Sequence, residues 1–120
     1  MFILSPQERN KIYLSAIEAF GEDMQLTVVV EELAELAKEI CKRQRGIGDL
    51  DSISEEMADV YIMIEQMALM LDNWGGIRRH IQAKTKRLYW RILQHCEENG
   101  IPTPEYLKEI KNVGDMSGKT

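Results

Sequence analysis

Proline and cysteine are both scarce in this chain. Prolines stand only at positions 6, 102 and 104 of the 120 residues, so the stretch 7–101 contains none. Continuous helices need such a stretch, because proline breaks the interior of a helix. The two cysteines, Cys41 and Cys96, are too few for a disulfide scaffold or a zinc cluster. We interpret them as reduced thiols of a cytoplasmic protein.

The chain also lacks an excess of positive charge and a long uninterrupted apolar run. Its 15 Lys and Arg against 20 Asp and Glu give a formal net charge of −5, which argues against nucleic-acid binding, whose footprint is basic. The longest apolar stretch, 57–71, contains Asp59, Glu65 and Gln66 and does not suit a membrane span. Residues 1–6 are too short for the apolar segment of a secretory signal. We expect a cytoplasmic protein with no membrane partner and no stable nucleic-acid partner.

Helical patterns divided by glycines fill the sequence. Ser5, Pro6 and Glu8 predict a capped helix that ends at Gly21. A second helix is expected over about 22–45. A third is expected from Ser52 to about 73, with Glu55 completing a capping box, a fourth over about 77–98, and a short last one from 103–105 to about 111. Apolar residues recur every three or four positions in the helices over 22–45 and 52–73. The expected inward residues are Leu26, Val29, Val30, Leu33, Leu36, Ala37 and Ile40, then Met57, Val60, Tyr61, Ile64, Met67, Ala68 and Leu71.

These patterns predict an all-α fold with a four-helix core and a short C-terminal helix. The length suits one domain, which we expect over residues 1–113. Residues 114–120 are expected to form a flexible tail.

Acidic side chains occur in pairs on two of the predicted helices. Glu32 and Glu35 share one helix face, as do Glu56 and Asp59, because residues three apart are neighbours on a helix. A solvated face would explain any one pair, but Asp59 is a poor helix former inside an apolar run. A short loop makes the helices antiparallel neighbours, so the pairs can converge. Converging carboxylates repel one another and lose hydration, and a hard cation such as magnesium or manganese removes that cost.

Basic side chains are concentrated further along the chain. The stretch 77–96 holds six of them and no acid, whereas 22–65 holds twelve acidic and four basic side chains. An acidic metal cluster together with a basic helix is typical of a polyphosphate site, while a solvated face is the alternative for the basic stretch alone. The six are Arg78, Arg79, Lys84, Lys86, Arg87 and Arg91.

The acidic motif resembles the signature of a known enzyme family. Glu31-Glu32-x-x-Glu35, twenty residues and then Glu56-x-x-Asp59 is similar to the motif of the MazG-like all-α nucleoside triphosphate pyrophosphohydrolases. Lys84-x-x-Arg87-Leu88-x-x-Arg91 resembles the basic stretch that follows in many members. The resemblance covers about residues 10–95.

The resemblance implies a fold, a reaction and a set of site residues. The fold is a four-helix core that assembles as a homodimer or homotetramer. The reaction is Mg²⁺-dependent hydrolysis, with Mn²⁺ as a substitute, of a nucleoside triphosphate between the α- and β-phosphates to a monophosphate and pyrophosphate, which suits cleaning of the nucleotide pool. The implied metal ligands are Glu32, Glu35, Glu56 and Asp59, the implied catalytic carboxylates are Glu31 and Glu35, and the implied phosphate contacts are Lys84, Arg87 and Arg91.

Two other functions stay open at this point. A ferritin-like di-iron bundle uses Glu-x-x-His pairs, and no histidine lies near Glu35 or Asp59 in the sequence. A non-catalytic helical interaction protein would use the basic helix over 77–98 as its contact surface, but that function does not explain Asp59 within an apolar run. Magnesium-dependent release of pyrophosphate separates both from the enzyme. The sequence leaves the nucleotide itself open.

Overall fold

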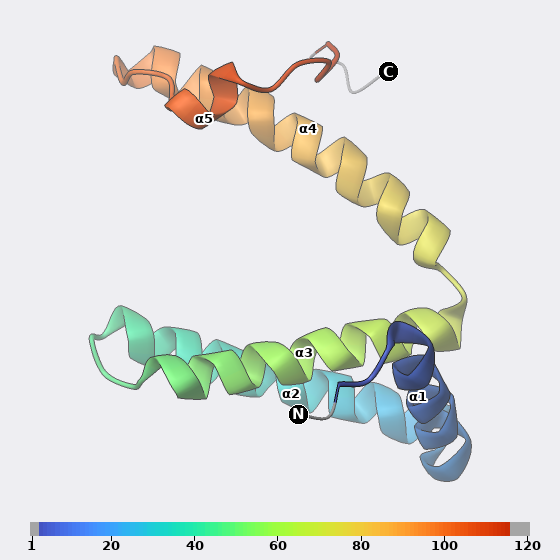
Figure 1. Cartoon of the computed structure of the whole chain (residues 1–120). Coiled ribbons are helices and arrows are strands. Elements are labelled where there is room, and N and C mark those ends of the chain that lie inside the picture. Colours follow the sequence, from blue (N-terminus) through green and yellow to red (C-terminus); the bar gives the residue numbers. More distant parts are fainter. Residues whose placement is uncertain (1–2, 116–120) are drawn as a thin grey trace. The chain divides into compact units, whose positions relative to one another are not determined.

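The computed structural model describes residues 3–115, and within that range the chain is helical and has no strand (Figure 1). The all-α prediction is confirmed. Residues 116–120 of the predicted tail lie outside the described residues. The helices are α1 (Pro6–Phe20), α2 (Glu22–Gln44), α3 (Leu50–Leu71), α4 (Trp74–Asn99) and α5 (Glu105–Lys108).

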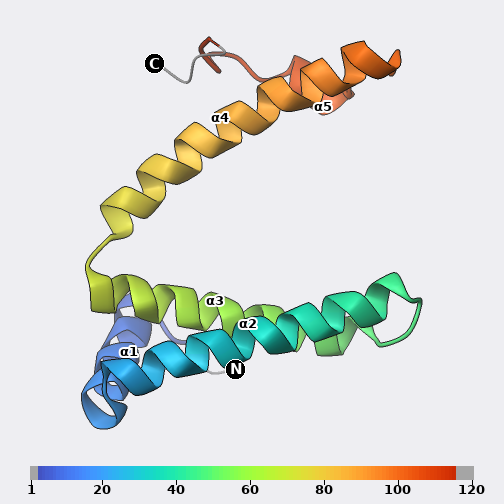
Figure 2. The ribbon, with the colours of Figure 1, turned by 180° about the vertical axis from the view of Figure 1, so that it is seen from behind.

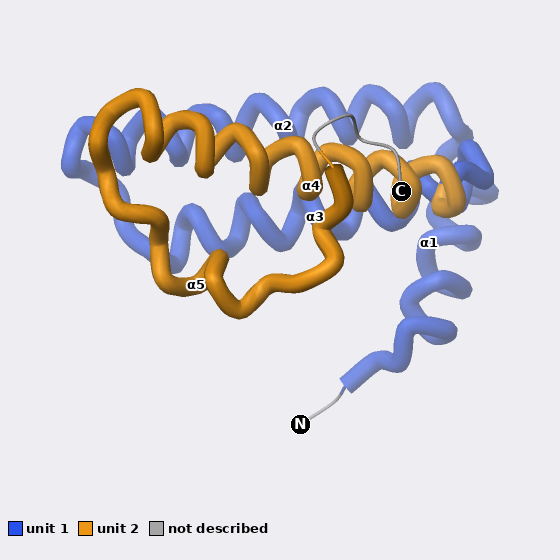
Figure 3. The backbone as a smooth tube through the Cα atoms, turned by 90° about the horizontal axis from the view of Figure 1, so that it is seen from above, with its two compact units in different colours: residues 1–73 blue, residues 74–120 orange. Residues whose placement is uncertain are grey.

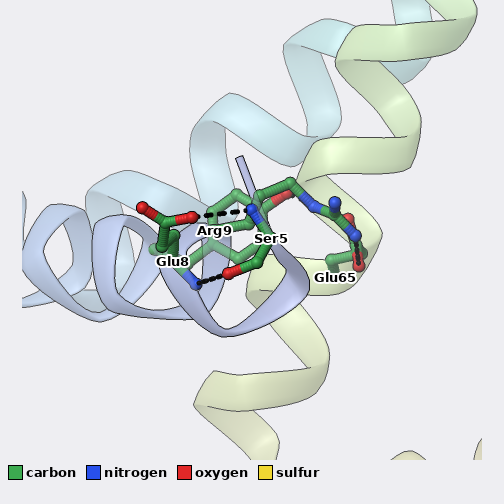
Figure 4. Close-up of polar contacts among 5 residues, drawn as sticks. Ser5, Glu8, Arg9 and Glu65 are labelled. Carbon is green, nitrogen blue, oxygen red and sulfur yellow. Dashed lines mark hydrogen bonds and ion pairs between the residues drawn. The ribbon is translucent and has the colours of Figure 1, made fainter. Parts of the chain in front are cut away.

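The predicted start of α1 is confirmed in detail. The Ser5 hydroxyl accepts a hydrogen bond from the Glu8 backbone N–H at 3.1 Å, and the Glu8 carboxylate accepts one from the Ser5 backbone N–H at 2.9 Å (Figure 4). Pro6 takes the first helical position, where no hydrogen-bond donor is needed. Two of the otherwise unpaired N–H groups at this end are therefore satisfied.

The predicted first or last residues of three other helices are wrong. The helix α3 begins at Leu50 because the Asp49 carboxylate, not Ser52, is the N-cap and accepts from the Ser52 N–H at 2.7 Å. The break before α4 falls at Asp72, which has a left-handed φ of 49°, so the following Gly75 and Gly76 lie inside α4. The helix α5 has no side-chain cap and ends at Lys108.

The chain divides into two compact units, Met1–Asn73 and Trp74–Thr120, which Figure 3 shows in different colours. In the first unit α2 and α3 form an antiparallel hairpin, and α1 crosses one end of it (Figure 2). The second unit contains α4, α5 and the segment that follows α5. A single domain over residues 1–113 stays a prediction.

The residues along the line where α2 and α3 meet follow one another at intervals of three or four on each helix. Gln25 and Gln66 are buried and hydrogen-bonded to each other, from the Gln66 amide N–H to the Gln25 carbonyl. One turn further along lie Val29 and Met63, both buried. The next positions in this series are Glu32 on α2 and Asp59 on α3. The line therefore leads directly from a buried amide pair to the acidic residues.

The helix α1 is attached to α3 by a polar contact. The Tyr13 hydroxyl donates to Glu65 at 2.9 Å. Arg9 forms an ion pair with the other oxygen of the same carboxylate at 3.5 Å (Figure 4). Tyr13 is buried, and burial together with this carboxylate raises the pKa of its phenol. The neutral phenol is therefore held as a hydrogen-bond donor.

Most of the apolar residues expected to face inward are exposed in this chain, which corrects the prediction. Val30 is 67% exposed, Tyr61 63% and Met57 58%. Within the unit Met1–Asn73, two antiparallel helices and one crossing helix cover only a narrow strip of each partner, so the unit by itself does not cover the remainder of each apolar face. The other exposed members of the expected set are Leu26, Leu33, Ala37, Ile40, Ile64 and Leu71. No described helix is long and apolar enough to cross a membrane.

Candidate metal centre

Three carboxylates converge where α2 and α3 face each other. Glu32 lies on α2, and Glu56 and Asp59 lie on α3 one turn apart. Each offers an oxygen within 4.8 Å of the oxygens of the other two, and all three side chains are half-buried. Helical spacing and the short loop before α3 produce this arrangement, since they place residues 32 and 59 at facing positions of an antiparallel pair.

The two remaining predicted carboxylates are placed differently. Glu35 is exposed and lies outside the group of three, although its charge acts on both Glu32 and Glu56. Glu31 is exposed and is not part of the group. The structure thus brings together three of the four predicted ligands, while the roles of all of them stay predictions.

Burial and repulsion between carboxylates disfavour the charged forms of Glu32 and Glu56. Loss of hydration is the largest cause that raises the pKa of Glu32, followed by the charges of Asp59 and Glu56. Loss of hydration is also the largest cause of the raised pKa of Glu56, followed by the charges of Asp59 and Glu35. The ordinary pKa of a glutamate is 4.5. In the absence of metal, Glu32 and Glu56 therefore oppose folding most at a pH above their raised pKa values, where both are charged. That opposition fades as the pH falls toward 4.5.

One oxygen of the cluster has no hydrogen bond. Among the described residues, no donor reaches the buried Glu56 Oε2. A buried carboxylate oxygen without a partner is costly, and a divalent cation supplies the missing interaction. Three converging carboxylates, two of them with raised pKa values, and one unpaired oxygen therefore fit a hard cation with oxygen ligands, such as Mg²⁺ or Mn²⁺.

Comparison with known protein families matches residues 20–86 to the MazG nucleotide pyrophosphohydrolase domain. This is more than half of the chain. The chain belongs to the MazG family. The match spans α2, α3 and the first half of α4, and it includes every residue of the acidic cluster. The resemblance drawn from the motif is confirmed, and the MazG domain indicates nucleotide pyrophosphohydrolase activity. No curated protein and no solved structure matches the chain.

The MazG domain contains a further acidic residue that the sequence analysis missed. Glu39 is half-buried, its charge contributes to the raised pKa of Glu56, and its carboxylate accepts from Lys42 at 3.2 Å. The sequence spacing indicates this position, since Glu39 follows Glu32 by seven residues and so lies on the same helix face.

The predicted phosphate contacts of the MazG domain lie on α4. Lys84, Arg87 and Arg91 are exposed, and their spacing of three and four residues places them on one face. The family match ends at residue 86 and so includes only the first of the three.

Proposed function

We propose that the chain is a magnesium-dependent nucleoside triphosphate pyrophosphohydrolase, with Mn²⁺ able to replace Mg²⁺. It cleaves a ribo- or deoxyribonucleoside triphosphate between the α- and β-phosphates to a monophosphate and pyrophosphate, and it acts on the nucleotide pool of the cytoplasm. The observation that supports this reaction best is the group of Glu32, Glu56 and Asp59 within a MazG domain.

The acidic residues divide between two roles in this proposal. Glu32, Glu35, Glu56 and Asp59 hold the cation. When bound, the cation neutralises phosphate charge and stabilises the charge that develops on the leaving oxygen. Glu31 or Glu35, whose carboxylates are exposed, accepts the proton of the attacking water.

The basic face of α4 is proposed to bind the phosphate groups of the substrate. Lys84, Arg87 and Arg91 bind the phosphate oxygens through charge-assisted hydrogen bonds, which are the stronger kind in proteins. Support comes from their exposure on one helix face and from the acid-free stretch in which they occur.

A second copy of the chain is proposed to cover the exposed apolar faces of α2 and α3. Val30, Leu33, Met57 and Tyr61 are all at least half exposed, and contiguous apolar patches on soluble proteins mark interfaces. We expect a homodimer or homotetramer at micromolar concentration. Sedimentation equilibrium measures the mass, and a 13.9 kDa monomer would contradict the assembly.

The reaction is tested by a screen of ribo- and deoxyribonucleoside triphosphates with pyrophosphate detection. We expect one or more of them to release pyrophosphate with Mg²⁺ and none to do so in excess EDTA. Release of orthophosphate instead would contradict cleavage between the α- and β-phosphates. No release from any nucleotide with either cation would favour the alternative, a non-catalytic helical protein that binds partners through α4.

A further inference from the structure

A cavity lies within the unit Trp74–Thr120, between α4 and the segment 110–113. Its volume is about 590 Å³, within the range of roughly 300–1,000 Å³ for small-molecule sites. The helix and the segment line it with both apolar and cationic side chains. Those that carry the argument are Arg79, Lys86, Tyr89, Ile110, Lys111 and Val113.

The charges around the cavity favour an anion. Arg79, Lys86 and Lys111 line it, and none of the described residues that line it is acidic. The Lys86 amine is 4.0 Å from the Asp115 carboxylate, and the two side chains are 8% and 68% exposed. A dianionic ligand in the cavity would compete with this carboxylate for the Lys86 amine.

These cations are separate from the proposed phosphate contacts of the enzyme reaction. Arg79 and Lys86 are seven residues apart and share one face of α4, whereas Lys84, Arg87 and Arg91 occupy another. The other wall, 110–113, lies outside the segment that matches the MazG domain. Most of the α4 wall of the cavity thus lies inside the matched segment, and the opposite wall lies outside it.

We propose that this cavity binds a phosphate monoester with a flat organic body, of the class of a nucleoside monophosphate. The phosphate lies against Arg79, Lys86 and Lys111 and takes the place of the Asp115 carboxylate. The organic body lies on the Tyr89 ring between Ile110 and Val113. Three cations match a dianion, and the aromatic and aliphatic walls match a ring. This site needs no metal and stands independently of the proposed reaction.

Titration calorimetry with adenosine and uridine 5′-monophosphate in EDTA tests the site. We expect both to bind the full chain, inorganic phosphate to bind more weakly, and the neutral nucleosides to bind least. Asp59→Asn should bind the monophosphates as the wild type does, which separates this cavity from the acidic cluster. An absence of binding by both monophosphates up to millimolar concentration would overturn the proposal.

Matched variants locate the binding. Three variants remove one cation each from the cavity: Arg79→Ala, Lys111→Ala and Lys86→Met. Each should weaken the binding of the monophosphates about ten- to hundred-fold, the range for one charge-assisted hydrogen bond. The neighbouring Arg78→Ala is the control and should change little, because Arg78 does not line the cavity.

Asp115→Asn should bind the monophosphates about two- to fivefold more tightly, because it removes a competing carboxylate 4.0 Å from the Lys86 amine. Arg79 and Lys111 are exposed, so these variants test the site even if Lys86→Met does not fold. Equal losses for Arg78→Ala and Arg79→Ala, or weaker binding by Asp115→Asn, would reject it.

Discussion

Asp59→Asn is expected to lower kcat for pyrophosphate release by about a hundredfold or more. The substitution keeps the shape of the side chain and removes one of three carboxylates that meet within 4.8 Å. Charge stabilisation by a bound metal contributes several kcal/mol to the transition state, and each ~1.4 kcal/mol is a factor of ten in rate. Steady-state kinetics with the best nucleotide of the screen measures the effect.

Asp51→Asn is the matched control for this variant. Asp51 lies in the first turn of α3, is exposed and does not belong to the cluster, so its loss should change kcat little. A near wild-type kcat for Asp59→Asn, or an equal fall for Asp51→Asn, would contradict the metal centre.

The stability of Asp59→Asn distinguishes a lost ligand from a lost fold. Without divalent cations at pH 7 the variant should melt at or above the wild-type temperature, because the Asp59 charge helps to raise the pKa values of Glu32 and Glu56. The charged forms of Glu32 and Glu56 lower the stability of the fold. This loss of stability is complete above their raised pKa values and fades as the pH falls toward 4.5. The difference in melting temperature should therefore narrow as the pH is lowered.

Lys84→Ala and Arg87→Ala are each expected to raise KM about ten- to hundred-fold and to change kcat much less. A phosphate contact already present with bound substrate is uniform binding, and its loss appears in KM. One charge-assisted hydrogen bond contributes roughly 1.5–3 kcal/mol. Both variants should also show a weaker dependence of kcat/KM on salt, since fewer charges attract the substrate.

The control for these variants is Arg78→Ala, on the same helix but outside the basic face of Lys84 and Arg87. It should leave KM within about twofold of the wild type, because exposed charges far from a ligand are screened. If kcat/KM is unchanged in Lys84→Ala and Arg87→Ala, that face of α4 is only solvated. The phosphate contacts would then lie elsewhere, with Lys38 and Lys42 of α2 as the next residues to vary.

The sequence was sufficient for the helices and for most of the acidic cluster. Both follow from local geometry, since the helical period and the lack of proline predict long helices, and spacings of three residues predict shared faces. Helix ends were predicted less well, because neighbouring residues compete as caps. At α3, Asp49 takes the position that Ser52 was expected to fill.

Burial was the part that the sequence could not predict. An apolar stripe shows which face avoids water but not which surface covers it, so Val30 and Tyr61 were expected inside and are exposed. Gln25 and Gln66 gave no such signal, because a glutamine is more often solvated than buried. Their burial depends on each meeting the other, a long-range contact between positions 41 residues apart.

That amide pair also contributes to the axial alignment of the two helices. A slide of α3 by one residue would turn its side chains by about 100° and shift them about 1.5 Å, which would break the hydrogen bond between Gln66 and Gln25. Asp59 lies seven residues from Gln66, about 10 Å along the same helix, and would move with it. The spacing of the carboxylates is thus coupled to two uncharged side chains that do not belong to the cluster.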